Sequence, residues 1–345
     1  MYCKEKLDSV EKLDAFLSVP APGLVEMMRR LPGDIMILGI AGKMGVTMGM
    51  QAVEAIRMAG VDKKVYGVAR FSNPEERAKL EKAGIRTIVC DLLDREQVNA
   101  LPPCPNVIFM AGRKFGTQGD EAQTWAMNAL TPAHAAEHFR DSRIVFFSTG
   151  CVYPLRSAAE GGCTEETAPA PIGEYSQSCL ARERIFEYFQ SKYGTKMLIF
   201  RLNYAIDLRY GVLHDICRPI WEGHPVDNTV GAFNAIWQGD ANACALRALE
   251  LADSPRRILN VTGPETVDTV AAAREMGKIL GKEVRFTREK SGDLGYLSDS
   301  TQMCALFGPP RVSMQELIRL QAEWIASGGV SIGKPTHFEV NNGKF

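Results

Sequence analysis

Three glycines spaced for contact with phosphate follow a short apolar run near the start of the chain. The run Ile35 to Leu38 precedes Gly39, Gly42 and Gly45, and the helix-like segment Val46 to Met58 follows them. Glycine permits a tight turn and lets backbone amides approach a phosphate, while the N-terminus of a helix favours negative charge. The spacing G-x-x-G-x-x-G therefore predicts a site for a dinucleotide pyrophosphate, although an ordinary strand-to-helix turn is compatible with the same glycines.

Basic residues near this loop bear on which dinucleotide it would take. The apolar run Lys64 to Ala69 ends at Arg70, with no carboxylate at that point. An acidic side chain there would bind the ribose 2'-hydroxyl of NAD, whereas arginine accommodates the 2'-phosphate of NADP. Lys43, inside the glycine loop, adds a second cation near the same phosphate. These residues favour NADP over NAD, and the alternative is that both are solvated surface charges.

The segments that must position these residues alternate between strand-like and helix-like patterns. Further strands are expected at Arg86–Cys90, Asn106–Met110 and Arg143–Phe147, with helices at Asn73–Ala83, Arg95–Leu101 and Glu121–Phe139. Strands that are nearly continuous apolar runs, alternating with helices, predict a parallel sheet covered on both faces. We therefore expect an α/β, doubly wound, Rossmann-type fold with its ligands at the carboxyl ends of the strands.

Composition excludes several classes of function. A net charge of -1 over 345 residues gives no bulk electrostatic reason to bind nucleic acid or an anionic membrane. The start of the chain lacks the apolar core of a signal peptide, and no apolar run approaches the roughly 20 residues of a membrane span. Nine cysteines without a C-x-x-C pair and five histidines without ligand-like grouping indicate reduced thiols and no metal site. We expect a cytoplasmic protein.

More specific motifs follow the fourth and fifth expected strands. They are F-S-T-G-C-V-Y-P at Phe147–Pro154, Tyr175 in G-E-Y-S-Q-S-C-L, Asp91 in C-D-L-L-D, the pair Ala111-Gly112, Asn128, R-L-N-Y-A at Arg201–Ala205 and I-W-Q-G-D ending at Asp240. Together with the glycine loop, and in this order, they resemble the extended short-chain dehydrogenase/reductase family. That family includes NAD(P)-dependent sugar epimerases and dehydratases. The resemblance covers roughly Asp34 to Ser327.

The resemblance implies a set of residues that contact the cofactor. In the family the position of Asp91 approaches the adenine, and backbone at Ala111-Gly112 runs beside the dinucleotide. The implied cofactor-binding residues are Gly39, Gly42, Lys43, Met44, Gly45, Arg70, Asp91, Leu92, Ala111, Gly112, Asn128, Tyr175 and Cys179.

The resemblance also implies the catalytic residues. In the family a Ser or Thr orients the reacting oxygen, and a Tyr acts as general acid or base. By position the orienting residue here is Thr149, with Ser148 as its neighbour, and the general acid or base is Tyr175. A free tyrosine has a pKa of about 10, so it needs help to act as a base at neutral pH. The family supplies that help with a lysine one helical turn after the tyrosine. In this chain that position is Cys179, whose neutral thiol cannot stabilise a tyrosinate electrostatically.

Three explanations of this departure are open. Another cation takes over, which could be Arg113, Lys114 or Arg182, the last on the same helical face as Tyr175. Alternatively, the chemistry does not require a strongly acidified tyrosine. In the third case the protein binds NADP without catalysis, as a sensor or scaffold. A buried, inert thiol is favoured over a nucleophilic role for Cys179.

The rest of the chain is expected to provide substrate binding. We expect an N-terminal helical extension at 1–33, a dinucleotide-binding domain at 34–203 to which about 236–262 returns, a substrate-binding region at 204–235 and 263–330, and a tail at 331–345. The substrate candidates are Arg113, Lys114, Tyr204 and Arg209. The resemblance implies hydride transfer on a sugar, nucleotide sugar or sugar acid, and a homodimer formed through the helices Glu121–Phe139 and Glu174–Gln190.

Overall fold

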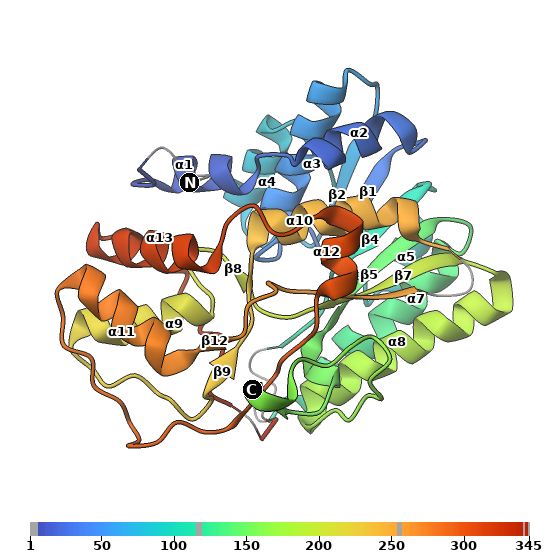
Figure 1. Ribbon diagram of the computed structural model, residues 1–345. Coiled ribbons are helices and arrows are strands. Elements are labelled where there is room, and N and C mark those ends of the chain that lie inside the picture. The colour runs from blue at the N-terminus through green and yellow to red at the C-terminus, as the bar shows by residue number, and fades with distance from the viewer. Residues whose placement is uncertain (1–5, 115–118, 254–256, 341, 344–345) are drawn as a thin grey trace.

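The protein is organised around a seven-stranded parallel sheet (Figure 1). The structure is a computed structural model and describes residues 6–114, 119–253, 257–340 and 342–343. The strands are β1 (Ile35–Leu38), β2 (Val65–Ala69), β3 (Arg86–Val89), β4 (Asn106–Phe109), β5 (Arg143–Thr149), β7 (Lys196–Leu202) and β11 (Arg257–Val261). Their order is β11-β7-β5-β4-β1-β2-β3. The predicted doubly wound α/β fold is confirmed.

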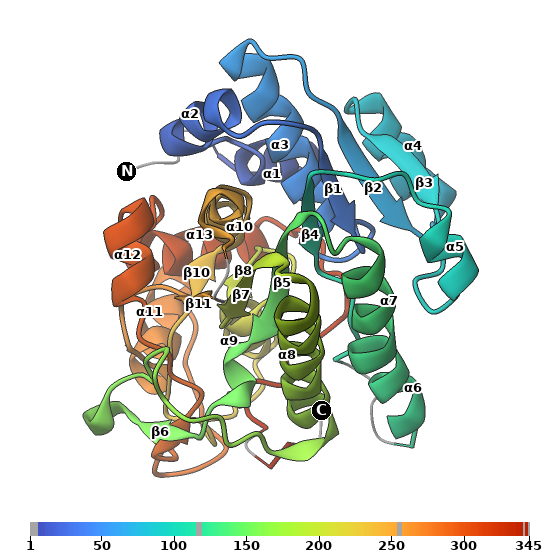
Figure 2. The ribbon, with the colours of Figure 1, turned by 90° about the vertical axis from the view of Figure 1, so that its right-hand side faces the viewer.

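Helices cover both faces of this sheet because its strands are apolar on both sides. In β1, Ile35 and Ile37 face one hydrophobic core while Met36 and Leu38 face the other, as the two-residue period of a strand requires. The first core is closed by α2 (Pro22–Arg30), α3 (Gly45–Ala59), α4 (Pro74–Lys82) and α10 (Gln238–Arg247). The second is closed by α5 (Arg95–Asn99), α7 (Thr131–His138) and α8 (Gly173–Tyr193). Figure 2 shows β1 and β5 between these two layers.

A second lobe, defined by the hydrophobic core of four helices, lies beside the sheet (Figure 1). The helices are α1 (Val10–Leu17), α9 (Val212–Glu222), α11 (Thr269–Leu280) and α13 (Met314–Ala326). The described residues also form three two-stranded sheets and the short helix α12 (Thr301–Phe307). The sheets pair β8 (Ala205–Ile206) with β10 (Ile236–Trp237), β9 (Ala232–Phe233) with β12 (Val267–Asp268), and β6 (Arg156–Ser157) with β13 (Leu294–Gly295). None of the helices in the described ranges combines the length and apolar character needed to cross a bilayer.

The helix expected over Glu121–Phe139 is interrupted. It consists of α6 (Glu121–Trp125), a π-helical turn η1 (Ala126–Leu130) and α7. Pro132 accounts for the break, because it has no N–H to donate to the carbonyl of Asn128 one turn earlier. Such π turns often occur at functional sites.

Candidate active site

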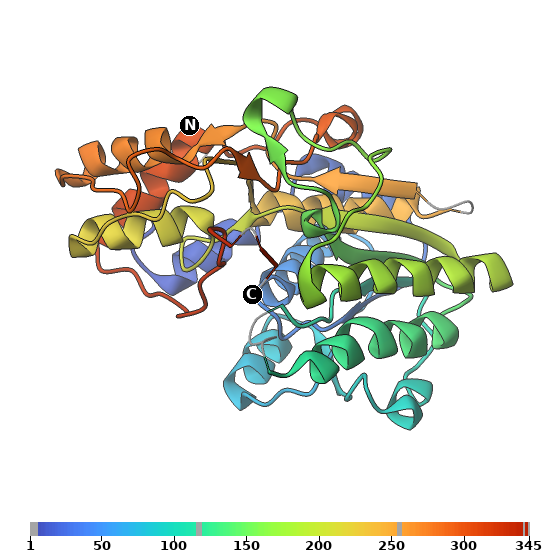
Figure 3. The ribbon, with the colours of Figure 1, turned by 90° about the horizontal axis from the view of Figure 1, so that it is seen from below.

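The candidate site lies where the carboxyl ends of β1 and β4 meet. The chain leaves β1 for β2 on one side and returns to β4 on the other, so this is the switch point at which doubly wound sheets bind ligands. A cavity of about 420 Å³ opens there, between the glycine loop, the start of α8 and the second lobe. Figure 3 shows the C-terminal tail, in red, reaching this region from the second lobe.

The glycine loop has the geometry of a phosphate cradle. Gly39 has φ of +92°, and a Cβ there would lie 2.8 Å from the Ala111 nitrogen. A Cβ on Gly45 would lie 2.2 Å from the carbonyl oxygen of Ile40, so both positions require glycine. Gly42, Lys43 and Met44 line the cavity, and no described side chain caps the N-terminus of α3. These residues therefore fit a dinucleotide pyrophosphate at the first turn of α3.

The residues expected to bind the adenosine half lie beyond this cavity, at the ends of β2 and β3. Arg70 is exposed directly after β2, while Asp91 is half-buried and Leu92 is buried after β3. Lys43 does not join them, because its Nζ donates to the carbonyl oxygen of Lys334 at 3.2 Å and lies 4.4 Å from the ring centroid of Tyr210. Lys43 thus faces the second lobe.

The cavity brings Tyr175 and Thr149 together. Thr149 ends β5, where its hydroxyl accepts a hydrogen bond from the Cys151 nitrogen at 3.2 Å, and Tyr175 is half-buried in the first turn of α8. Burial raises the pKa of Tyr175 well above its usual range, and Cys179 and Cys151 act in the same direction. A hydrogen bond with Thr149 and the positive charge of Arg182 oppose this increase in the pKa of Tyr175.

The hydroxyl of Ser148, the other candidate on β5, is part of a buried polar network. It donates to Glu183 Oε1 at 2.5 Å. Glu183 also pairs with Arg201 through two hydrogen bonds of 2.9 and 2.6 Å, and Arg201 donates to the Tyr153 hydroxyl at 2.8 Å. Both members of the ion pair are at most 2% exposed. Ser148 therefore connects the site to a charged pair between α8 and β7.

Cys179 occupies the position one turn after Tyr175 on α8. It is 1% exposed, and burial raises the pKa of its thiol to about 11. The group is therefore a neutral thiol at physiological pH and supplies no charge to Tyr175.

Arg182, two turns after Tyr175, places a cation in the wall of the cavity. It is 5% exposed. Its guanidinium donates to the Phe147 carbonyl at 2.7 Å, to Asn128 Oδ1 at 2.8 Å and to the Asn128 carbonyl at 3.4 Å. All three acceptors are neutral, and no ion pair joins Arg182 to a carboxylate in the described part of the chain. The guanidinium therefore lies in the wall of the cavity without an ion pair to a carboxylate among the described residues.

Asn128 holds both Arg182 and the loop after β4. Its side chain accepts from the Arg113 nitrogen at 2.8 Å and donates to the Arg113 carbonyl at 2.9 Å and to Ser178 Oγ at 3.0 Å. The Asn128 carbonyl is available to Arg182 because Pro132 cannot donate to it. Gly112 leaves the space for this arrangement, since a Cβ there would lie 2.5 Å from the Arg182 guanidinium. Pro132, inside the helix expected over Glu121–Phe139, is the feature of the sequence that could have predicted an unpaired Asn128 carbonyl.

The substrate candidates lie in two different places. Lys114 Nζ lies 5.7 Å from the Tyr175 ring centroid and 5.9 Å from that of Tyr204, whose φ of +42° is unusual for a tyrosine. Arg113 lines the same cavity and pairs with Asp120 at 2.5 Å. Arg209 instead lines a neighbouring cavity of about 370 Å³.

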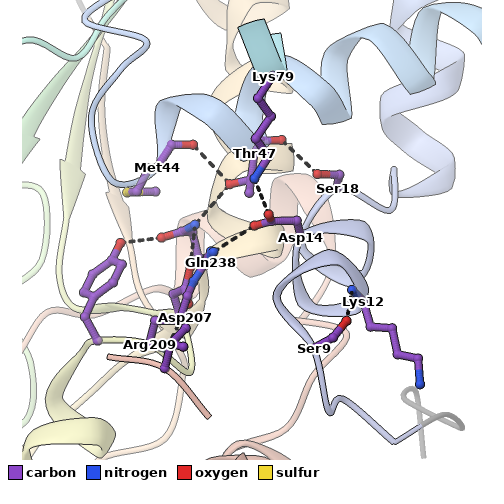
Figure 4. Close-up of polar contacts among 12 residues, drawn as sticks. Ser9, Lys12, Asp14, Ser18, Met44, Thr47, Lys79, Asp207, Arg209 and Gln238 are labelled. Carbon is purple, nitrogen blue, oxygen red and sulfur yellow. Dashed lines mark hydrogen bonds and ion pairs between the residues drawn. The ribbon is translucent and has the colours of Figure 1, made fainter. Parts of the chain in front are cut away.

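Arg209 belongs to a polar network that joins α1, near the N-terminus, to α3, the helix after the glycine loop (Figure 4). It pairs with Asp14 of α1 at 3.0 Å and with Asp207 at 2.6 Å. Gln238 extends this network by donating to Asp207 Oδ2 at 3.5 Å and to the Thr47 hydroxyl of α3 at 3.1 Å. The network fixes the second lobe against the start of α3.

The C-terminal tail forms one wall of the candidate cavity. Lys334 and Thr336 line the cavity. Thr336 donates from its nitrogen and hydroxyl to Asp215 Oδ2 at 2.7 and 2.5 Å, and the Ile332 nitrogen donates to the Arg209 carbonyl at 3.2 Å. Phe338 is buried in the second-lobe core and anchors the segment. In the described residues no group of three or more His, Cys, Asp or Glu is arranged to hold a metal ion.

Several solved structures that are similar to this chain are epimerases or dehydratases of nucleotide sugars. A UDP-N-acetylglucosamine 4-epimerase from Methanobrevibacter ruminantium has a TM-score of 0.70 at 16% identity, covering 86% of this chain and 99% of that one. A UDP-glucose 4-epimerase from Thermotoga maritima, solved with UDP-glucose, has a TM-score of 0.68 at 19% identity, with coverage of 86% and 99%. A dTDP-glucose 4,6-dehydratase from Bacillus anthracis, in complex with NAD, has a TM-score of 0.69 at 14% identity, with coverage of 85% and 96%.

The sequence comparison with protein families gives the assignment that these distant structures cannot give alone. No curated protein sequence is significantly similar to this chain. The sequence model described as the NAD dependent epimerase/dehydratase family matches residues 35–206, which include the glycine loop, Thr149 and Tyr175. The chain therefore belongs to the NAD-dependent epimerase/dehydratase family of enzymes.

Proposed function

We propose that this protein is an NAD(P)-dependent epimerase, dehydratase or dehydrogenase of a sugar, nucleotide sugar or sugar acid, with Tyr175 as its general acid and base. The observation that carries the proposal is the convergence of Tyr175, Thr149 and the glycine loop on one cavity. The similar structures named above include complexes with UDP-glucose and with NAD, which supports this class of substrate and cofactor.

We propose NADP as the preferred cofactor, with NAD as the alternative. Arg70, exposed after β2 with no carboxylate in its place, supports this preference. Gly39, Gly42 and Gly45, with the first turn of α3, would hold the pyrophosphate, and Asp91 and Leu92 would approach the adenine. The bound nicotinamide would supply the acceptor and donor of hydride.

In this proposal two side chains control proton transfer at one substrate oxygen. Thr149 would orient the reacting hydroxyl, and the Tyr175 phenol would accept its proton during oxidation and return a proton during reduction. Because burial raises the pKa of Tyr175, the phenol needs a neighbouring positive charge to ionise. Arg182 takes the role of the missing lysine, since its charge opposes the increase in the pKa of Tyr175 and Asn128 holds it in place.

We also propose a cytoplasmic homodimer. The dimer would form through α6, η1, α7 and α8, where Leu130, Tyr188 and Tyr193 are exposed large side chains. Light scattering would measure the mass of the protein in solution. A monomer at micromolar concentration would contradict the dimer.

The first test is a titration with NADPH, NADH, NADP and NAD, followed by nicotinamide fluorescence for the reduced forms and by heat for the oxidised forms. We expect tighter binding of the phosphorylated pair and loss of that preference in Arg70→Ala. Lys82→Ala, on α4, is the matched control. If none of the four binds at millimolar concentration, the proposal is wrong.

The second test separates an enzyme from a non-catalytic NADP-binding protein. Turnover of UDP-glucose, UDP-glucuronic acid and free sugars is followed by nicotinamide absorbance and by chromatography of the products. We expect Tyr175→Phe to abolish turnover while dinucleotide binding is retained. Tight dinucleotide binding with no turnover of any of these substrates would favour the sensor or scaffold alternative.

A further inference from the structure

The catalytic cavity is strongly basic. Five of its lining residues are cationic, namely Lys43, Arg113, Lys114, Arg182 and Lys334, and none of its described lining residues is Asp or Glu. A concave site that is lined by positive charges and has low-dielectric walls focuses the electrostatic field and raises the local concentration of an anion. The protein as a whole has a net charge of -1, so this charge is local to the cavity.

Three of these cations lie close enough together to repel one another. The pKa of Lys43 is lowered to about 8, first by burial and then by the positive charges of Lys114 and Lys334. Asp215 and Asp207 oppose this decrease, but Asp215 accepts from Thr336 and Asp207 pairs with Arg209. An anion bound among the three ammonium groups would relieve their repulsion.

The dinucleotide can account for only part of this charge. Lys43 belongs to the glycine loop, so a cofactor phosphate would lie near it. Lys114 follows β4 and lies over the ring of Tyr175, at the reacting end of the cavity. Lys334 comes from the tail, which is tied to the second lobe at Asp215 and Arg209. Lys114 therefore faces the space of the substrate, and Lys334 lies between this cavity and the neighbouring one that Arg209 lines.

We propose that the substrate is a sugar that carries an anionic group of its own, a carboxylate or a phosphate, and that Lys114 and Lys334 bind this group, with the C-terminal tail delivering Lys334. The proposal deepens the proposed function and rests on it. The anionic group lies on the reacting sugar, because Lys114 is within 6 Å of the Tyr175 ring centroid. The tail is thus a determinant of substrate specificity.

The test compares ligands that differ in one charged group. Calorimetry with saturating NADP or NAD measures binding of D-glucuronate, D-glucose 6-phosphate and neutral D-glucose, and then of UDP-glucuronic acid and UDP-glucose. We expect at least one anionic sugar to bind about tenfold or more tighter than D-glucose, because a charge-assisted contact has about this effect. D-glucuronate and D-glucose 6-phosphate distinguish a carboxylate from a phosphate.

Lys334→Gln and Lys114→Gln should each reduce that preference about tenfold. Lys334→Gln keeps the contact with Lys43, which uses the main-chain oxygen of Lys334. Lys278→Gln, on the exposed face of α11, is the control and should leave the preference unchanged. Circular dichroism would verify that each variant is folded.

Several results would overturn this inference. The first is equal affinity for anionic and neutral sugars. The second is no binding of any sugar at about 10 mM. The third is a preference for anionic sugars that survives both Lys334→Gln and Lys114→Gln. An equal loss for UDP-glucose and UDP-glucuronic acid in Lys334→Gln would assign the lysine to the diphosphate instead. Dinucleotide binding and the effect of Tyr175→Phe are measured separately, so the proposed function can stand while this inference fails.

Discussion

Replacing Arg182 tests whether a buried guanidinium has taken over from the missing lysine. Arg182→Met keeps an unbranched aliphatic stem and removes the guanidinium with its charge. An opposite charge about 4–6 Å away shifts a pKa by roughly 1–3 units. We use the lower end of this range, because Arg182 lies two helical turns from Tyr175 and donates to three other acceptors. We therefore expect the pKa of Tyr175 to rise by about one unit, which is about 1.4 kcal/mol.

The assay is the pH profile of kcat/KM for oxidation of whichever sugar the enzyme turns over. Oxidation needs the tyrosinate, and the pKa of Tyr175 is raised by burial, so activity should increase with pH through the alkaline range. In Arg182→Met the midpoint should move up by about one unit, with about tenfold lower activity below it. Arg182→Lys keeps a positive charge and should recover most of the shift.

The matched control is Arg184→Met, on the same helix. Arg184 is 54% exposed and pairs with Glu187, so its loss should leave the midpoint unchanged. Equal midpoints in Arg182→Met and Arg184→Met would refute the electrostatic role of Arg182. If Arg182→Lys behaved like Arg182→Met, Arg182 would act through its hydrogen bonds to Asn128 and Phe147 and not through its charge.

Three further substitutions test the surroundings of the site. Cys179→Lys puts a second cation beside Arg182 in a position that is 1% exposed. The free energy of unfolding, measured in urea, should therefore fall by about 3 kcal/mol or more, and turnover should not increase. A gain in turnover would contradict the role of Arg182. Glu183→Gln leaves the charge of Arg201 unpaired and should lower the free energy of unfolding by about 3–5 kcal/mol. Glu187→Gln, the control, should lower it by less than about 1 kcal/mol. Equal losses would show that the buried pair is not important for stability. Gly39→Ala should abolish NADP binding measured by calorimetry, because of its clash with Ala111, whereas Gly60→Ala, also at positive φ but in open space, should retain it.

The parts of the site that depend on local sequence could be predicted. The three glycines follow an apolar run and precede a helix, and this order is enough to place a phosphate cradle at the end of β1. Tyr175 and Thr149 were identified from a motif, and the structure places both in one cavity with the glycine loop. The sheet followed from the alternation of apolar runs and helices, because each such run must be covered on both faces.

The parts that depend on contacts between distant segments could not be predicted. The hydroxyl of Ser148 binds Glu183, a residue on another element, so its neighbour Thr149 alone bonds to Tyr175. Arg182 was one of three candidate cations, and only its hydrogen bonds to Asn128 and Phe147 distinguish it. Lys334 reaches the site through a tail anchored by Thr336, and no periodicity in the sequence reports such a path.

The path of the chain between the sheet and the second lobe has a consequence for folding. After β7 the chain enters the second lobe at α9, returns to the sheet for α10 and β11, and leaves again for α11 and α13. Leu246 of α10 and Leu259 of β11 are fully buried in a core that also contains Ile37 of β1. A fragment ending after β7 would expose this core to water and lose an edge strand, so it lacks the apolar burial that makes a domain autonomous. The core of the sheet is therefore complete only after the chain has passed through the second lobe, and the sheet cannot form as an autonomous domain before α10 and β11 are present.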